Sequence, residues 1–126
     1  MNNPTRIDAR STGKPMKICI CSDGETQQST VSTVFGRCAY FALIEDGSEK
    51  IQFVQNTANH ENHGAGIAAA QSMLDWQIDV LIAPPPGPKA SQVLQNSTIQ
   101  HYLPQGQTIK EALAFYRQGK LVKGNT

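Results

Sequence analysis

The stretch Ser29–Phe41 combines residue types that suit an anion or a soft metal. It begins with hydroxyl side chains and turns at Phe35-Gly36-Arg37. Gly36 can adopt a positive φ or admit a close backbone neighbour, and the Arg37 guanidinium offers a rigid fork of donors. Cys38 follows as a soft ligand. The same residues also suit an ordinary surface turn, so this stretch alone leaves both interpretations open.

A second loop carries two histidines. His60 and His63 are three residues apart and can share a metal ion if the loop turns helically, with Glu61 as a further ligand or acceptor. Two solvent-exposed histidines are the alternative. The following Gly64-Ala65-Gly66 leads into a predicted helix, and free amides at a helix start favour an anion. An anionic metal–sulfide cluster would use both features.

A third loop, Pro84–Lys89, follows a near-continuous apolar strand. The carboxyl ends of strands in open α/β sheets are where such folds bind ligands. Gly87 precedes a helix and Lys89 adds positive charge, but the spacing of a phosphate-binding Walker A loop is absent. A rigid strand-to-helix connection is the alternative reading.

The cysteines divide into a pair and a single residue. Cys19 and Cys21 share one face of a predicted strand, roughly 6.5–7 Å apart, which is too wide for an easy disulfide. On a central strand they are expected to be small core residues, with ligation as the alternative. Cys38 lies outside the core pattern and is the better candidate for a reactive or ligating thiol.

Periodicity and turn residues place these loops between the elements of an α/β domain with the order β-β-β-α-β-α-β-α. A hairpin is expected at Asp46-Gly47-Ser48, and a capping box at Thr108 and Glu111. The predicted strands are Lys17–Cys21, Tyr40–Glu45, Lys50–Gln55, Asp79–Ala83 and Ile99–Leu103, and the predicted helices are Ile67–Trp76, Lys89–Asn96 and Ile109–Gln118.

Composition limits the function classes. The chain has 126 residues and a net charge of +1, which gives no electrostatic case for nucleic acid or an anionic membrane. We expect one folded domain at residues 16–121, preceded by a disordered leader or cloning remnant at 1–15 and followed by a polar tail at 122–126. No secretory signal or membrane span is visible, so a cytoplasmic protein with reduced cysteines is expected.

The sequence gives little support for a hydrolytic enzyme. A Gly-x-Ser-x-Gly nucleophile elbow is absent. A nuclease would need several carboxylates converging on the strand ends to hold two metal ions, whereas Asp23, Glu45 and Asp79 are scattered along the chain. The paired Cys-x-x-Cys motifs of a structural zinc site are also missing.

Short motifs spread over most of the chain resemble the dinitrogenase iron–molybdenum cofactor biosynthesis family. They run in order from Met16 to about Leu121: Met16-Lys17-Ile18, Ser22-Asp23-Gly24, Val31-Ser32, Phe35-Gly36-Arg37, Tyr40-Phe41, Asn59-His60, Gly64-Ala65-Gly66, Ala69-Ala70-Gln71, Gly87-Pro88-Lys89-Ala90, Gly106, Thr108, Glu111-Ala112, Tyr116 and Gly119-Lys120-Leu121. Two positions depart from the family pattern: Val34 stands where His is frequent, and Cys38 where a small residue is common.

The resemblance implies a ribonuclease-H-like α/β fold with a five-stranded mixed sheet, an antiparallel second strand and three helices. It also implies a small binding or carrier protein and not an enzyme. Relatives bind molybdenum- or iron-containing sulfide clusters, and in one branch a mixed molybdenum–copper sulfide cluster.

We therefore expect a cradle for an anionic metal–sulfide cluster, containing molybdenum with iron or copper, between Ser29–Cys38, His60–Gly66 and Pro84–Lys89. The expected partners are cluster donor and acceptor proteins, and the expected state is a monomer or weak dimer. The alternatives are an interaction module without cofactor and a small metal-dependent nuclease-like enzyme. The candidate cofactor-binding residues are Ser29, Thr30, Ser32, Phe35, Gly36, Arg37, His60, Gly64, Gly66, Gly87 and Lys89, and the candidate metal ligands are Cys38, His60 and His63.

Overall fold

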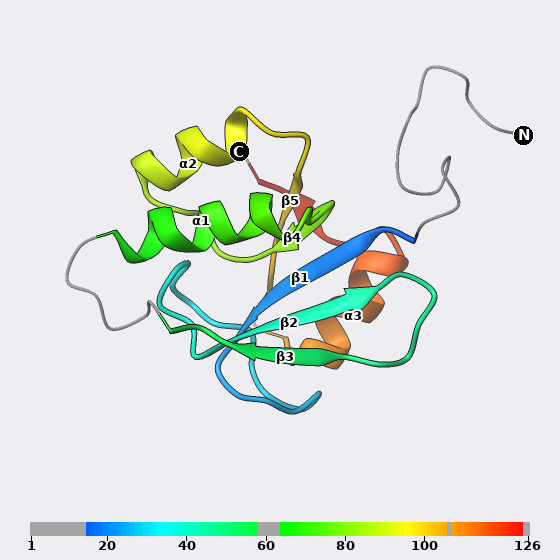
Figure 1. Ribbon diagram of the computed structural model, residues 1–126. Helices are drawn as coiled ribbons and strands as arrows, with labels where there is room; N and C mark the ends of the chain where they lie inside the picture. The colour runs from blue at the N-terminus through cyan, green and yellow to red at the C-terminus, as the bar shows by residue number, and fades with distance from the viewer. Residues whose placement is uncertain (1–14, 58–63, 106, 125–126) are drawn as a thin grey trace, which may run out of the picture.

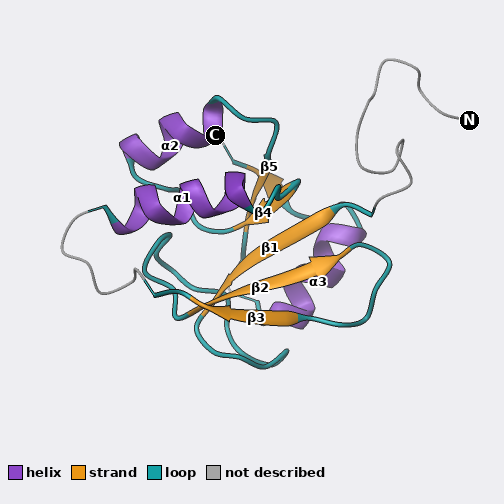
Figure 2. Ribbon diagram, in the orientation of Figure 1, coloured by secondary structure: helices purple, strands orange, loops and turns teal. Residues whose placement is uncertain are grey.

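A computed structural model describes residues 15–57, 64–105 and 107–124. Its strands are β1 (Lys17–Ser22), β2 (Tyr40–Glu45), β3 (Gln52–Gln55), β4 (Val80–Ile82), β5 (Gln100–Leu103) and β6 (Val122–Lys123), and its helices are α1 (Ala65–Asp75), α2 (Pro88–Gln95) and α3 (Ile109–Arg117). Helices α1 and α2 lie side by side over one face of the sheet and α3 lies on the other (Figures 1 and 2).

The sheet has six strands in the order β3-β2-β1-β4-β5-β6. Strands β1, β4 and β5 are parallel, while β2 is antiparallel to β1 and β3, and β6 is antiparallel to β5. The predicted α/β architecture, mixed sheet, three helices and antiparallel second strand are confirmed.

The predicted count of five strands is wrong, because part of the expected polar tail at 122–126 forms β6. Val122 and Lys123 are both exposed, so they show no alternation of apolar and polar residues. The strand is defined by backbone pairing of these two residues with Leu103 and Tyr102. Sequence periodicity reports burial and could not detect it.

Most other element boundaries agree with the sequence to within two residues. Strand β2 matches the prediction, and β3 begins two residues later than expected. Helix α1 begins at Ala65 and not at Ile67, since Gly64 already occupies the N-cap position. The predicted capping box of α3 is present: the Thr108 side chain accepts from the Glu111 backbone N–H, and the Glu111 side chain accepts from that of Thr108.

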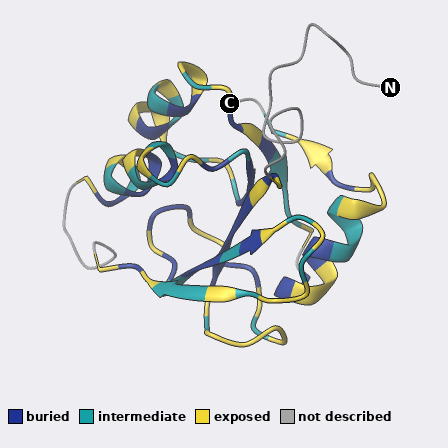
Figure 3. Ribbon diagram, turned by 45° about the vertical axis from the view of Figure 1, so that its right-hand side comes forward, coloured by how far each residue is buried: buried dark blue, intermediate teal, exposed yellow. Residues whose placement is uncertain are grey.

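Strand β1 separates two hydrophobic clusters because its side chains alternate between the faces. Cys19 and Cys21 point into the cluster under α1 and α2. Ile18 and Ile20 point into the cluster under α3. The interior of the sheet is accordingly buried on both sides (Figure 3). None of the helices in the described ranges is long and apolar enough to cross a membrane.

The connection between β1 and β2 contacts elements on both faces of the sheet, first α3 and then α1. Its first part runs to α3, where the Ile109 backbone N–H donates to the Ser29 carbonyl at 2.8 Å. It then returns to β1, where the Ser32 N–H donates to the Cys21 carbonyl at 2.8 Å. From there the chain passes beneath the start of α1 before entering β2 (Figure 1).

Candidate functional site

The turn containing Gly36 lies directly against the first turn of α1. Gly36 has a φ of 87°, a conformation that L side chains rarely adopt. A Cβ atom there would lie 2.7 Å from the Gly66 Cα and 2.9 Å from the Gly66 nitrogen. Phe35 is buried beneath α1 and holds the turn in place. Two glycines therefore permit a backbone-to-backbone contact between segments far apart in the sequence.

The first turn of α2 lies beside that of α1. Gly87 is its N-cap residue, and its carbonyl accepts from the Ser91 N–H at 2.8 Å. Pro88 suits the first helical position because it has no N–H group to leave unsatisfied. A Cβ on Gly66 would lie 3.6 Å from the Ala90 Cβ. The two helix starts border a shallow, open hollow of about 360 Å³, lined by Gly64, Gly66, Ile67, Gly87, Pro88, Lys89 and Ala90.

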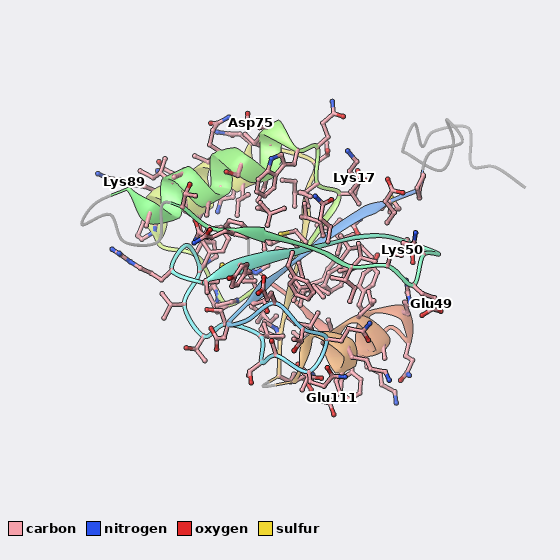
Figure 4. The ribbon with its side chains drawn as sticks, turned by 60° about the horizontal axis from the view of Figure 1, so that its bottom comes forward. Lys17, Glu49, Lys50, Asp75, Lys89 and Glu111 are labelled. Carbon is pink, nitrogen blue, oxygen red and sulfur yellow. The ribbon has the colours of Figure 1, made fainter. Side chains whose placement is uncertain are left out.

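Both helix starts are electropositive. The N-cap residues Gly64 and Gly87 have no side chain with which to cap the helix, and neither first turn contains an acidic residue. The amides of a helix N-terminus carry partial positive charge and favour an anion. Lys89 is exposed at this end of α2 (Figure 4), and Arg37 is exposed beside Gly36. The accessible lining of the hollow is mostly apolar, so the positive charge lies at its edges, in the helix starts and these two basic side chains.

The structure gathers most of the described candidate residues around this hollow. Gly64, Gly66, Gly87 and Lys89 line it, and the Phe35-Gly36-Arg37 turn contacts its α1 side. His60 and His63 lie outside the described residues.

Three hydroxyl residues have other surroundings. Ser29 contacts the start of α3 through its carbonyl, and its side chain lies 3.0 Å from the Thr26 hydroxyl. Thr30 forms a β-bridge with Thr108. Ser32 is buried and its hydroxyl donates to the Val34 carbonyl at 3.3 Å. Ser29 and Thr30 therefore belong to the α3 side of the molecule.

Cys38 is fully buried, which corrects the expectation that it lies outside the core. It joins Cys19 and Cys21 in the cluster under α1 and α2. A loop residue next to an exposed arginine gives no periodic signal of burial, so its position depended on how the connection folds over β1. The predicted core position of Cys19 and Cys21 is confirmed.

Asn56 is a buried residue that the sequence did not single out. Its side-chain amide donates to the Gly36 carbonyl at 3.0 Å and to the Cys38 carbonyl at 2.9 Å. Its backbone N–H donates to the Ala39 carbonyl at 2.9 Å. Asn56 therefore fixes the turn against which α1 packs. An asparagine after a strand is common in loops, and only the fold reveals these partners.

No group of three or more histidine, cysteine, aspartate or glutamate side chains within residues 15–57, 64–105 and 107–124 is arranged to hold a metal ion. Asp79 instead accepts a hydrogen bond from the Lys17 backbone N–H at 2.8 Å. The described carboxylates thus give the nuclease alternative no support.

A larger groove of about 1020 Å³ lies at the other end of α1, between its last residues and the β2–β3 hairpin. Its rim carries charges of both signs, Lys17 and Lys50 beside Glu45 and Asp75; three of these are labelled in Figure 4. It includes neither helix N-terminus nor any candidate site residue. The smaller hollow is the better site for an anion.

Three comparisons place the chain among known proteins. It is 30% identical over 113 residues to an uncharacterized protein, MJ0580, of Methanocaldococcus jannaschii, covering 87% of this chain and 92% of that protein. It superposes on the apo form of the orange protein from Desulfovibrio gigas with a TM-score of 0.81 and 28% identity, covering 88% of this chain and 94% of that one.

A second solved structure, that of a Thermotoga protein of the DUF35 family, superposes with a TM-score of 0.76 and 30% identity over 88% of this chain and 95% of that one. The model of the family described as dinitrogenase iron-molybdenum cofactor matches residues 16–119. Because this match spans most of the chain, the protein belongs to the dinitrogenase iron-molybdenum cofactor family.

Proposed function

We propose that this protein binds and carries an anionic metal–sulfide cluster at the hollow between α1 and α2. The observation that carries the proposal is the pair of adjacent helix N-termini, each with a glycine N-cap and no acidic residue in its first turn. The family to which the chain belongs is named for the iron–molybdenum cofactor of dinitrogenase. Molybdenum with iron or copper is the metal content that we propose.

The chemistry of the hollow fits such a cargo. Sulfide-coated clusters accept weak hydrogen bonds from backbone N–H groups and carry net negative charge. The first-turn amides of α1 and α2 would donate to the sulfides, while Lys89 and Arg37 would offset the charge. Ile67, an exposed apolar residue that lines the hollow, would pack against the surface of the cluster. His60 and His63 stay proposed direct ligands.

The protein would act as a carrier and not as an enzyme, receiving the cluster from one protein and passing it to another. We further propose a ribonuclease-H-like description of the fold. Its support is the strand order of the first five strands, β3-β2-β1-β4-β5, with β2 antiparallel to its neighbours.

Anaerobic reconstitution tests the proposal. Protein incubated with tetrathiomolybdate and either Cu⁺ or Fe²⁺ should develop charge-transfer absorption and retain metal through gel filtration. Lys89→Gln and Arg37→Gln should each reduce retention about threefold to tenfold at low salt, as expected for one partly solvated charge near an anion. Lys123→Gln, a matched change on the distant strand β6, should leave retention unchanged. Colourless, metal-free protein, or equal losses in all three variants, would contradict the proposal.

A further inference from the structure

The two edge strands of the sheet differ in length and charge. Strand β3 forms one edge and β6 forms the other (Figure 2). Strand β6 has two residues, one of them Lys123, and short or charged edges resist pairing with another chain. Strand β3 has four residues, none of them charged or proline, and its central Phe53 and Val54 are half-buried. By these criteria β3 is the edge that can accept a further strand.

Alternate residues of β3 direct their backbone groups away from the sheet. The Asn56 backbone N–H donates to the Ala39 carbonyl at 2.9 Å, in register with the pairing of β3 and β2. In an antiparallel pair every second residue turns its N–H and C=O groups towards the neighbouring strand, so the even-numbered residues of β3 also face β2. Phe53 and Gln55 therefore face outward, and no described backbone group pairs with theirs on that side.

This outward pattern is complementary to itself about Phe53. When two copies of one edge strand pair antiparallel, the two-fold axis is perpendicular to the sheet, so opposed residues lie on the same face. An axis at Phe53 lets the two copies of this residue exchange both of their backbone hydrogen bonds. It also sets Gln55 of one copy opposite Ile51 of the other, whose backbone groups point outward by the same alternation. Such a pairing provides about six hydrogen bonds.

The charges near β3 are compatible with this pairing. Glu49 and Lys50 lie just before the strand. With the axis at Phe53 they lie opposite Thr57 and Asn56 of the second copy, which are uncharged. No like charges are therefore opposed across the strand pair. The net charge of +1 adds little overall repulsion between two copies.

We propose that two copies of the chain associate through β3, antiparallel about Phe53, to form one continuous sheet. Both α1 helices then lie on the same face, and the apolar floor of each larger groove, which includes Leu43 and Val54, continues into the other copy. A single strand pair buries less area than a standard interface, so the dimer is weak, half formed at roughly 0.1–1 mM. The inference does not depend on cluster binding, since it uses the edge of the sheet and not the hollow.

Mass and amide exchange of the full-length wild-type chain test the proposal together. Sedimentation from about 20 µM to about 1 mM should show the average mass rising from 13.7 kDa towards twice that value. Over the same range, hydrogen exchange followed by NMR should slow about twofold to fivefold at the outward amides of Ile51, Phe53 and Gln55. The amides of Gln52 and Val54, which face β2, should exchange at a rate that does not depend on concentration.

Charge variants test whether β3 is the interface. In the proposed pairing Gln52 of one copy lies opposite Val54 of the other. The double variants Gln52→Lys/Val54→Lys and Gln52→Glu/Val54→Glu should each associate at least tenfold more weakly than the wild type, because like charges meet. An equimolar mixture of the two should form a heterodimer. Val122→Lys, which adds a charge to the other edge, should dimerise as the wild type does.

Circular dichroism shows whether each variant is folded, and the wild-type measurements stand without the variants. Three results would overturn the inference. The first is the mass of a single chain throughout the concentration range, and the second is a mixture of the two folded charge variants that stays monomeric. The third is protection of the outward amides that does not change with concentration, since another part of the same chain would then cover the edge.

Discussion

The helix starts on the two faces of the sheet satisfy their amides in opposite ways. At α3, the backbone N–H groups of Ile109 and Lys110 donate to carbonyls of the β1–β2 connection, and the capping box satisfies that of Glu111. At α1 and α2, glycines occupy the N-cap positions and no described side chain caps either helix. Lys89 and Glu111 mark these two ends in Figure 4.

The difference in capping indicates that the start of α3 has a structural role, whereas the starts of α1 and α2 can bind a ligand. Amides already bonded within the protein have no capacity for an external acceptor, whereas uncapped amides are favoured sites for anions. The same connection contributes to both regions: residues 27–31 complete α3, and residues 34–38 lie beneath α1. The predictions below test whether the two regions have these separate roles.

The largest effect is expected where the turn meets α1. Gly47→Ala should lower the free energy of unfolding by about 1 kcal/mol through its positive φ alone, since nothing lies within 4 Å of the added Cβ. Gly36→Ala should lower it by about 3 kcal/mol or more, because the Gly66 backbone must also move. Urea denaturation of both variants measures the difference. Equal losses would show that the contact with Gly66 adds nothing.

An acidic residue in the first turn of α1 should give that helix start a carboxylate, as Glu111 does in the first turn of α3. Ile67 is exposed and occupies the third helical position, so Ile67→Glu should stabilise the helix by about 0.3–1 kcal/mol. The same carboxylate should weaken retention of an anionic cluster by about tenfold. Ile67→Gln, which matches it in shape but not in charge, is the control. If both variants retain the cluster equally, the hollow does not recognise charge.

Removing the cap of α3 should affect stability alone. Thr108→Ala should lower the free energy of unfolding by about 1 kcal/mol, the usual effect of losing an N-cap side chain. Cluster retention by the folded variant should equal that of the wild type, since α3 lies on the opposite face of the sheet. Chemical denaturation and metal analysis measure the two quantities. A loss of retention in folded protein would remove the distinction between the helix starts.

The smallest expected effect is a loss of stability at acidic pH. His101 is buried on β5, and its Nε2–H donates to the Ala83 carbonyl at 2.7 Å, where the connection to α2 begins. Burial lowers the pKa of His101, so the unfolded chain takes up a proton more readily. Stability should therefore be fully present above about pH 6.5 and fall as the pH drops below it, levelling off beneath the folded pKa.

The variant His101→Gln keeps a donor for the Ala83 carbonyl and removes the titration. Its thermal midpoint should change less between pH 7 and about pH 5 than that of the wild type. A wild-type midpoint that rises on acidification would reverse the expected sign.

Local pattern was enough to predict most of the fold. Alternation along β1 predicted buried Cys19 and Cys21, and Thr108 with Glu111 predicted the start of α3, because a few adjacent residues determine these features. Three separate local patterns, a turn, a helix start and a strand end, selected Gly36, Gly66 and Gly87, which the structure brings together. Whether a cluster binds there stays a prediction.

Other features depended on contacts between distant segments. Only the tertiary structure decided that Cys38 is buried in the cluster under α1 and α2, that Asn56 fixes the turn, and that β6 completes the sheet. It also decided that Ser29 and Thr30 face α3. The physical reason is that propensity and periodicity act over a few neighbouring residues, whereas the burial of a loop side chain depends on which remote backbone groups pack against it.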